Sequence, residues 1–193
     1  MRREMLALGA FCAVFATTVA AGGIVDAAPK NTKSLNAFGP HIPKDGGIVN
    51  LTAYSDNDGP TSAVVLTGAI GDYGHAVRVT TSGSKAQDDD LQLTMSRGSF
   101  RLDIADIEGE LVRAVNSDFP TNSTTCSGLE EVTGSAPIVS DTGTRDYAGL
   151  HGTFHLTISI NEVERWPNCP KDDTSPYLAQ TVFISGSGSV SLK

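Results

Sequence analysis

Apolar and polar residues alternate along most of this chain, and this alternation restricts the fold more than any other feature of the sequence. From residue 46 onward, Gly, Asp, Asn and Pro separate the alternating stretches. Residues 152–161 are the clearest case, because Phe154, Leu156 and Ile158 share one face of an extended chain while polar residues occupy the other. A period of two is typical of strands with one buried side.

The strand pattern recurs at short intervals, and we expect no helix in residues 46–193. About eight successive strands without a helix predict an all-β fold, a single antiparallel eight-stranded barrel, with a β-sandwich as the alternative. A closed barrel of about eight strands has room inside for side chains or one small ligand. The stretches with the pattern are residues 48–54, 61–70, 75–81, 91–95, 100–104, 111–115, 130–134, 152–161 and 181–192.

The first 28 residues have the composition of an export signal. Arg2 and Arg3 precede an apolar run at residues 5–25, and small residues follow it. This order predicts a signal peptide cut after Ala27 or Ala28, with an uncleaved membrane helix as the alternative. The prediction places the protein outside the cell or in the cell envelope, with no membrane span after cleavage.

The remaining chain is long enough for one domain. Residues 29–45 mix Pro, Asn, Lys and Ser without periodicity and predict a flexible arm, and residues 46–193 form the predicted barrel domain. Its two cysteines, Cys126 and Cys169, predict a disulfide, since an even pair in an exported chain is most simply bonded. A metal site built on them is the alternative, but it lacks ligands at close spacing.

The charge and the histidine spacing exclude several partners. A formal net charge of -8 would repel nucleic acid. His151 and His155 lie about 13 Å apart along a strand, too far to share a metal ion. The sequence therefore predicts no metal, no cofactor and no nucleic-acid partner.

The segment Gly71-Asp72-Tyr73-Gly74-His75 lies between two apolar runs. Together with residues 64–70 and 77–79, it resembles a strand motif of plant allene oxide cyclases. Further along, residues 142–154 resemble a glycine-rich turn and strand that these enzymes and the related dirigent proteins carry in the same order. The resemblance covers about residues 64–158. It implies an eight-stranded antiparallel barrel that holds a hydrophobic ligand, and barrels of this kind often self-associate into homo-oligomers.

The phase of the strand after this motif suggests candidate site residues. His75 shares a face with Val77 and Val79, and we expect that face to line the cavity. His75 is then a candidate acid or base, because histidine in general titrates near neutral pH. The alternative is that His75 begins the strand and bonds a nearby loop.

Two tyrosines and several apolar residues complete the predicted site. Tyr73 and Tyr147 are expected at the barrel rim, with buried rings and hydroxyls in water. Tyr73 is a further catalytic candidate, and either hydroxyl would anchor the polar end of a ligand. Plain core packing is the alternative for the apolar set. The predicted ligand-binding residues are Val77, Val79, Phe100, Tyr147, Phe154 and Ile158.

The resemblance does not supply a catalytic set. The plant cyclases are understood to use a carboxylate near the cavity floor, but residues 48–54 contain no glutamate. Asp103 lies on the polar face of its strand and is expected outside the barrel. Three functions remain. The first is binding of a small apolar or amphipathic ligand inside the barrel, and the second is cyclisation or isomerisation of an epoxide or polyene-like substrate there. The third is a non-catalytic interaction protein whose interior is filled by its own side chains.

Overall fold

The computed structural model describes residues 42, 45–56, 62–79, 90–118, 121–165 and 177–193. The predicted signal peptide, residues 1–28, and most of the predicted arm lie outside the described residues. Ile42 of that arm is described, and it is buried in the core. Cys126 is also buried, but its predicted disulfide partner Cys169 lies outside the described residues, so that bond stays a prediction.

The described residues of the compact unit Pro40–Lys193 form eight strands, one α-helix and a short 3-10 helix. The described chain therefore confirms the mostly β prediction. The elements are β1 (Gly47–Asp56), β2 (Ser62–Gly68), β3 (Asp72–Val79), β4 (Asp90–Met95), β5 (Gly98–Asp103), α1 (Ala105–Asp118), β6 (Ser127–Pro137), η2 (Arg145–Tyr147), β7 (Leu150–Glu164) and β8 (Tyr177–Leu192).

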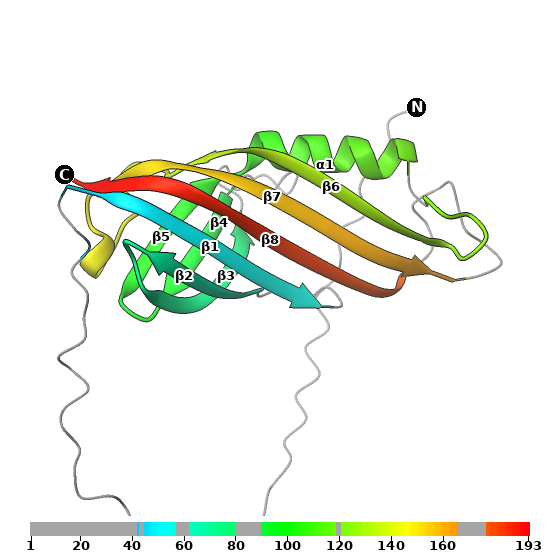
Figure 1. Cartoon of the computed structure of the whole chain (residues 1–193), viewed down its shortest axis with the longest axis horizontal. Helices are drawn as coiled ribbons and strands as arrows, with labels where there is room; N and C mark the ends of the chain where they lie inside the picture. Colours follow the sequence, from blue (N-terminus) through cyan, green and yellow to red (C-terminus); the bar gives the residue numbers. More distant parts are fainter. Residues whose placement is uncertain (1–41, 43–44, 57–61, 80–89, 119–120, 166–176) are drawn as a thin grey trace, which may run out of the picture. The chain divides into compact units, whose positions relative to one another are not determined.

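All eight strands belong to one antiparallel sheet in the order β5-β4-β3-β2-β1-β8-β7-β6. Apart from the β1–β8 pairing, neighbours in the sheet are also neighbours in sequence. The long strands β1, β8, β7 and β6 run side by side, and the shorter strands β2 to β5 continue the curl (Figure 1). The sheet is thus a half-barrel whose edge strands are β5 and β6.

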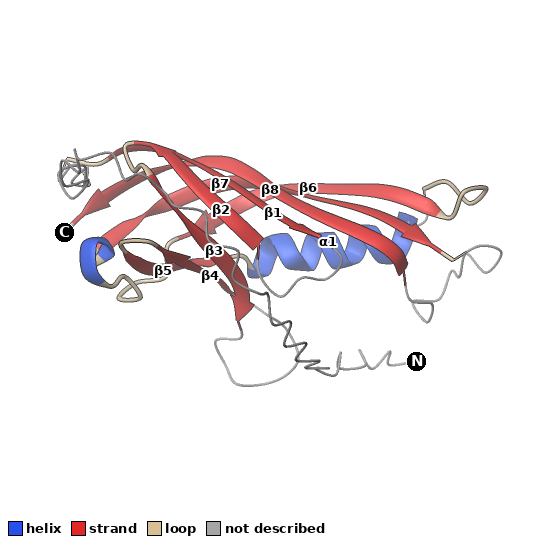
Figure 2. Ribbon diagram, turned by 90° about the horizontal axis from the view of Figure 1, so that it is seen from below, coloured by secondary structure: helices blue, strands red, loops and turns tan. Residues whose placement is uncertain are grey.

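The two edges approach each other at one end of the half-barrel. Just beyond β6, Ile138 forms an isolated bridge with Leu102 of β5, and the Val139 N–H donates to the Arg101 carbonyl oxygen at 3.0 Å. Helix α1 connects β5 to β6 and lies along the inner side of the long strands (Figure 2). Its Ile107 packs on Gly134 of β6, where a Cβ atom would lie 2.6 Å from the Ile107 Cγ1 atom.

Helix α1 corrects the prediction that no helix follows the N-terminal region. Residues 111–115, predicted as a strand, lie inside it. Ile107, Leu111 and Val115 recur every four residues and all pack on the core, which is a helical spacing. The prediction of a strand at residues 111–115 was wrong because Leu111, Arg113 and Val115, taken by themselves, also fit the period of two that is typical of a strand. Acidic Asp106 and Glu108 in the first turn favour the helix start.

Side chains from every strand fill the inside of the curl. Phe100, Phe154 and Leu156 are completely buried there. The alternation predicted for residues 152–161 is confirmed, because Phe154, Leu156 and Ile158 point inward and the residues between them point outward. One cluster of buried residues joins the sheet to Ile107 and Leu111 of α1, so the core continues across the gap between β5 and β6.

Candidate functional site

The structure places the predicted catalytic residues on the outside of the sheet. His75 and Tyr73 are exposed, with 70% of Tyr73 accessible, while Asp72 and Ala76 of the same strand are buried. Val77 and Val79 share the face of His75, as predicted. The expectation that this face lines the cavity is wrong, and so is the expectation of a buried Tyr73 ring. Strand β3 also begins at Asp72, so His75 lies within the strand rather than at its start.

Packing around β3 explains why its residues 73, 75, 77 and 79 point outward. Large side chains of other elements, Leu93, Phe100 and Tyr147, already occupy the interior. Among the inner positions of β3, positions 74 and 76 carry the small residues Gly74 and Ala76. At Gly74 a Cβ atom would lie 2.1 Å from the Thr94 carbonyl oxygen of β4. A valine at position 74 would therefore clash with the backbone of β4, whereas the outer face carries Val77 and Val79.

The other predicted ligand-binding residues are core residues. Phe100, Tyr147, Phe154 and Ile158 are buried on the inner side of the sheet. The Phe100 and Tyr147 rings pack with their centroids 5.0 Å apart. The sheet thus separates these four residues from His75, Tyr73, Val77 and Val79, and the predicted site does not come together as one constellation.

Asp72 is the polar centre that the sequence reasoning missed, and it joins the two motifs. Its side chain is only 1% exposed. The Tyr147 hydroxyl donates to Asp72 Oδ2 at 2.6 Å, and the Ser96 hydroxyl and the Tyr73 N–H donate to Oδ1. The sequence pattern could have indicated Asp72, because this residue lies on the same face of the strand as Gly74 and Ala76.

Arg97 closes this cluster from the β4–β5 turn. Its Nε atom lies 3.4 Å from Asp72 Oδ2, and its backbone N–H donates to the same oxygen. Its guanidinium also donates to the Gly71 carbonyl oxygen and lies 3.8 Å from Asp146. These contacts hold the start of β3, the β4–β5 turn and η2 together.

The surroundings of Asp72 and Tyr147 determine the protonation state of both side chains. Burial by itself would raise the pKa of Asp72, but the hydrogen bonds from Ser96, Tyr147 and the Tyr73 N–H, together with the Arg97 charge, hold it below its ordinary value. Burial raises the pKa of Tyr147, and the hydrogen bond to Asp72 and its negative charge raise it further. Asp72 is therefore a carboxylate at neutral pH, and Tyr147 is a neutral donor.

This cluster is suited to holding the fold rather than to transferring protons. Both oxygens of Asp72 already accept hydrogen bonds, and the Tyr147 proton is committed to one of them. A general base needs a free lone pair within reach of a substrate proton. Asp72 and Tyr147 offer their polar atoms to each other instead.

Glu130 is a second buried carboxyl, on the inner face of β6. Among the described residues no donor reaches its Oε1 atom. Burial and the nearby charge of Asp118 raise the pKa of Glu130 above its ordinary value of 4.5. The folded state thus favours the protonated form, so the contribution of Glu130 to stability is fully present below pH 4.5 and is lost as the pH rises through its folded pKa.

Replacing Glu130 with glutamine is expected to stabilise the protein at pH 7 by ~0.5–1 kcal/mol, because the amide imitates the neutral acid. Urea unfolding at pH 7 and pH 4 measures this gain, which should shrink at the lower pH. Glu131→Gln, at the next and exposed position, is the control and should change little. Equal stability of wild type and Glu130→Gln at pH 7 would contradict the assignment.

The outer face of the sheet is the side with accessible binding groups. We use this name for the side chains of β1, β2, β3, β7 and β8 that point away from the core. Within the described parts of these strands, Asp56 is the one charged residue on the outer face. Hydroxyl side chains are frequent there, and Ser185, Ser187 and Ser189 occupy successive outer positions of β8.

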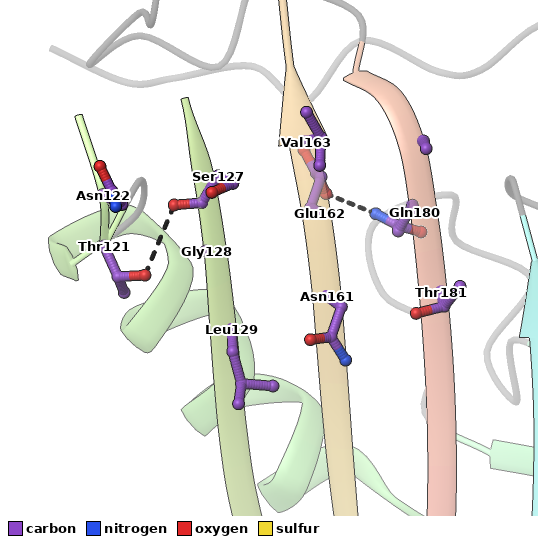
Figure 3. A pocket seen from close by; sticks show the side chains of 11 residues that line it. Thr121, Asn122, Ser127, Gly128, Leu129, Asn161, Glu162, Val163, Gln180 and Thr181 are labelled. Atoms are coloured by element: carbon purple, nitrogen blue, oxygen red, sulfur yellow. Dashed lines mark hydrogen bonds between the residues drawn. The ribbon is translucent and has the colours of Figure 1, made fainter. Parts of the chain in front are cut away.

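A groove with a volume of about 430 Å³ lies on the same side of the sheet. Leu129, Asn161 and Thr181 are register partners on β6, β7 and β8, and their side chains lie in a row (Figure 3). Val163, Ser127 and Thr121 also line the groove. Its charged member Glu162 accepts a hydrogen bond from Gln180 at 2.6 Å, and the other residues that line the groove are uncharged.

Neither a metal centre nor a membrane helix emerges from the described chain. No group of three or more His, Cys, Asp or Glu side chains in the described ranges is placed to hold a metal ion. The Ser191 hydroxyl lies 2.8 Å from His151 Nε2, and His155 Nδ1 lies 3.2 Å from the Ser135 hydroxyl. No helix among the described residues is both long and apolar enough to cross a membrane.

No protein-family model, curated protein or solved structure matches this chain. The resemblance to allene oxide cyclases and dirigent proteins therefore stays a prediction that rests on the two motifs. What the structure adds is that Asp72 of the first motif and Tyr147 of the second are hydrogen-bonded, 75 residues apart in sequence.

Proposed function

We propose that this chain is a non-catalytic interaction protein, in which a filled half-barrel supports a binding surface on the outer face of the sheet. The observation that carries the proposal is the distribution of large apolar side chains. Inside the curl, Phe100 and Phe154 are fully buried, while Tyr54, Tyr73 and Phe183 are 41–70% exposed on the outside. Contiguous apolar groups on a soluble surface commonly mark an interaction site.

The arrangement of the predicted site residues favours this function over the two that use the interior. An interior ligand would have to displace Phe100, Phe154 and Ile158 from their packing. A cyclase would need His75 or Tyr73 to reach that ligand from the opposite side of the sheet. An interaction protein needs neither change.

Export is part of the proposal. Residues 1–28 would direct the chain to the cell envelope or the medium, and Cys126 would bond Cys169 there. A binding surface built on a stable sheet suits such a location, because the partner then lies outside the cell. Self-association into a homo-oligomer is a separate proposal that rests on the family resemblance.

Two measurements test whether the interior or the outside binds. Native mass spectrometry of the protein purified from its own host should show the mass of the mature chain without a retained small molecule. An apolar fluorescent dye, 1-anilinonaphthalene-8-sulfonate, tests the same point. Any dye bound by the wild type should be lost in a Tyr54→Ala/Tyr73→Ala variant, since the apolar groups lie outside.

A retained small molecule in constant one-to-one ratio would overturn the proposal. Dye binding that is unchanged in the Tyr54→Ala/Tyr73→Ala variant would also overturn it, because it would place the apolar site inside the half-barrel. Ile48→Ala is the matched control, since Ile48 is as exposed as these tyrosines but lies six residues from Tyr54 on β1.

A further inference from the structure

Four exposed side chains form a continuous row across β8, β1, β2 and β3. Phe183 and Tyr54 are direct register partners, and so are Val65 and Tyr73. Tyr54 pairs with Ala63, two residues before Val65, so Tyr54 and Val65 are diagonal neighbours. Diagonal neighbours lie about 7–8 Å apart, within reach of aromatic side chains. We call Phe183, Tyr54, Val65 and Tyr73 the outer row.

Uncharged hydrogen-bonding groups surround the outer row. Thr52 pairs with both Val65 and Ser185, and Ser159 pairs with Phe183. His75 lies beside Ala63 in the register. A ligand lying along the row would therefore meet apolar rings in its centre and hydroxyl groups at its sides. Beyond Ser159 it would also meet the Glu131 carboxylate of β6, which accepts a hydrogen bond from the Ser159 hydroxyl at 3.0 Å.

The outer row continues into the groove of Figure 3. Thr181 of the groove is two residues before Phe183 on the same face of β8, about 6.6 Å away. Asp56 of β1 pairs with Thr181 and adds one carboxylate acceptor at the junction. From β6 to β3 the combined surface crosses five strand spacings, roughly 24 Å. This length suits an extended chain molecule better than a compact one.

The composition of this surface distinguishes between partner classes. A nucleic acid would need Lys or Arg side chains that the outer face does not carry, and a basic protein would find two carboxylates on or beside it, those of Asp56 and Glu131. Protein interfaces in general are depleted in serine, whereas Ser159, Ser185 and Ser187 flank or adjoin the row. Aromatic rings with hydroxyl and amide groups match a carbohydrate, because sugar rings have apolar C–H faces and hydroxyl edges.

We propose that the outer row and the groove together bind a neutral polysaccharide. The rings of Tyr54, Tyr73 and Phe183 stack on the C–H faces of successive sugar units. The hydroxyls of Thr52, Ser185 and Thr181 bond the sugar edges. This inference rests on the proposed function and names the partner of its outer surface.

Binding isotherms of the mature wild-type protein test the proposal. The neutral probes are insoluble cellulose and chitin by depletion, and soluble laminarin, glucomannan and hydroxyethyl cellulose by affinity electrophoresis. Polygalacturonate and alginate are the acidic probes. We expect binding to at least one neutral polymer and none to the acidic polymers, which the net charge of -8 repels.

Variants locate the site on the outer row. Tyr54→Ala and Tyr73→Ala should each weaken binding at least about tenfold, equivalent to about 1.4 kcal/mol. Tyr54→Phe should retain most of the affinity, since it keeps the ring. Ile48→Ala, equally exposed but outside the row, should bind like wild type. Circular dichroism confirms that each variant is folded.

Three outcomes would overturn the proposal. The first is binding of the wild type to none of the five neutral polymers, and the second is unchanged affinity in both alanine variants. The third is a dimer that Tyr54→Ala converts to a monomer without any polymer binding, which would assign the outer row to a second copy of this chain. These three outcomes would not contradict the proposal that the interior of the half-barrel is filled. A retained small molecule in native mass spectrometry would instead overturn the proposed function itself.

Discussion

Replacing Asp72 with alanine is expected to lower the free energy of unfolding by ~3–5 kcal/mol, as breaking a buried ion pair typically does. The change leaves the Arg97 charge, the Tyr147 hydroxyl and the Ser96 hydroxyl without their common acceptor. A loss of this size is a large share of the 5–15 kcal/mol typical of a domain. Urea unfolding at pH 7 measures it.

A milder pair of variants keeps this prediction testable where the alanine variant fails to fold. Tyr147→Phe removes one buried hydrogen bond and should cost ~1–3 kcal/mol. Tyr73→Phe is its matched control, because both tyrosines follow an aspartate in the two motifs but the Tyr73 side chain is exposed. Equal effects of the two substitutions would contradict the role given to the cluster.

The same cluster predicts a pH dependence. The folded pKa of Asp72 lies below its ordinary value of 3.8, so its carboxylate stabilises the fold above that pH. This contribution is lost as the pH falls below 3.8 and through the folded pKa. The stability difference between wild type and Asp72→Asn should therefore be largest near pH 7 and should shrink toward pH 2. A difference that is constant over this range would refute the assignment.

Replacing Phe154 with alanine is expected to cost ~3–5 kcal/mol, since a fully buried ring leaves a cavity that the surroundings cannot refill. The ring lies over Gly188 of β8, where a Cβ atom would be 2.7 Å from its Cγ atom. The neighbouring strand is thus shaped around this side chain. Chemical unfolding at pH 7 compares the variant with wild type.

Phe183 provides a matched control for Phe154, because it is the same residue type on the adjacent strand with its side chain on the opposite face. Phe183→Ala should change stability by less than ~1 kcal/mol. Comparable losses for the two substitutions would mean that the outer face is covered in solution, and that the assignment of inner and outer faces is incomplete.

Strand pattern predicted much of the fold because it depends on local sequence. Phe154, Leu156 and Ile158 alternate with polar residues, and they point into the core as expected. The same reasoning failed at residues 111–115, where a short apolar repeat fits two periods and only the longer series Ile107, Leu111 and Val115 reveals helix α1. The helix occupies the place in the chain where a strand at residues 111–115 was expected.

The candidate site was less predictable, because exposed aromatic residues look unremarkable one at a time. Tyr54 and Phe183 lie far apart in sequence, and each occupies a polar position of its strand. Their pairing depends on β1 and β8 meeting in register. One usable signal existed: a large aromatic residue at a polar position of an alternating strand indicates an exposed ring.

The sequence alone determined that His75, Val77 and Val79 share one face of a strand, because side chains on an extended chain alternate. It did not determine which face is inside. Tertiary structure decided that, since Leu93, Phe100 and Tyr147 fill the interior, and at Gly74 the backbone of β4 leaves no room for a larger side chain. The contact between Asp72 and Tyr147 likewise forms only when the curled sheet brings the two motifs together. Alternation is a local property of the backbone, whereas burial depends on the volume that distant strands leave free.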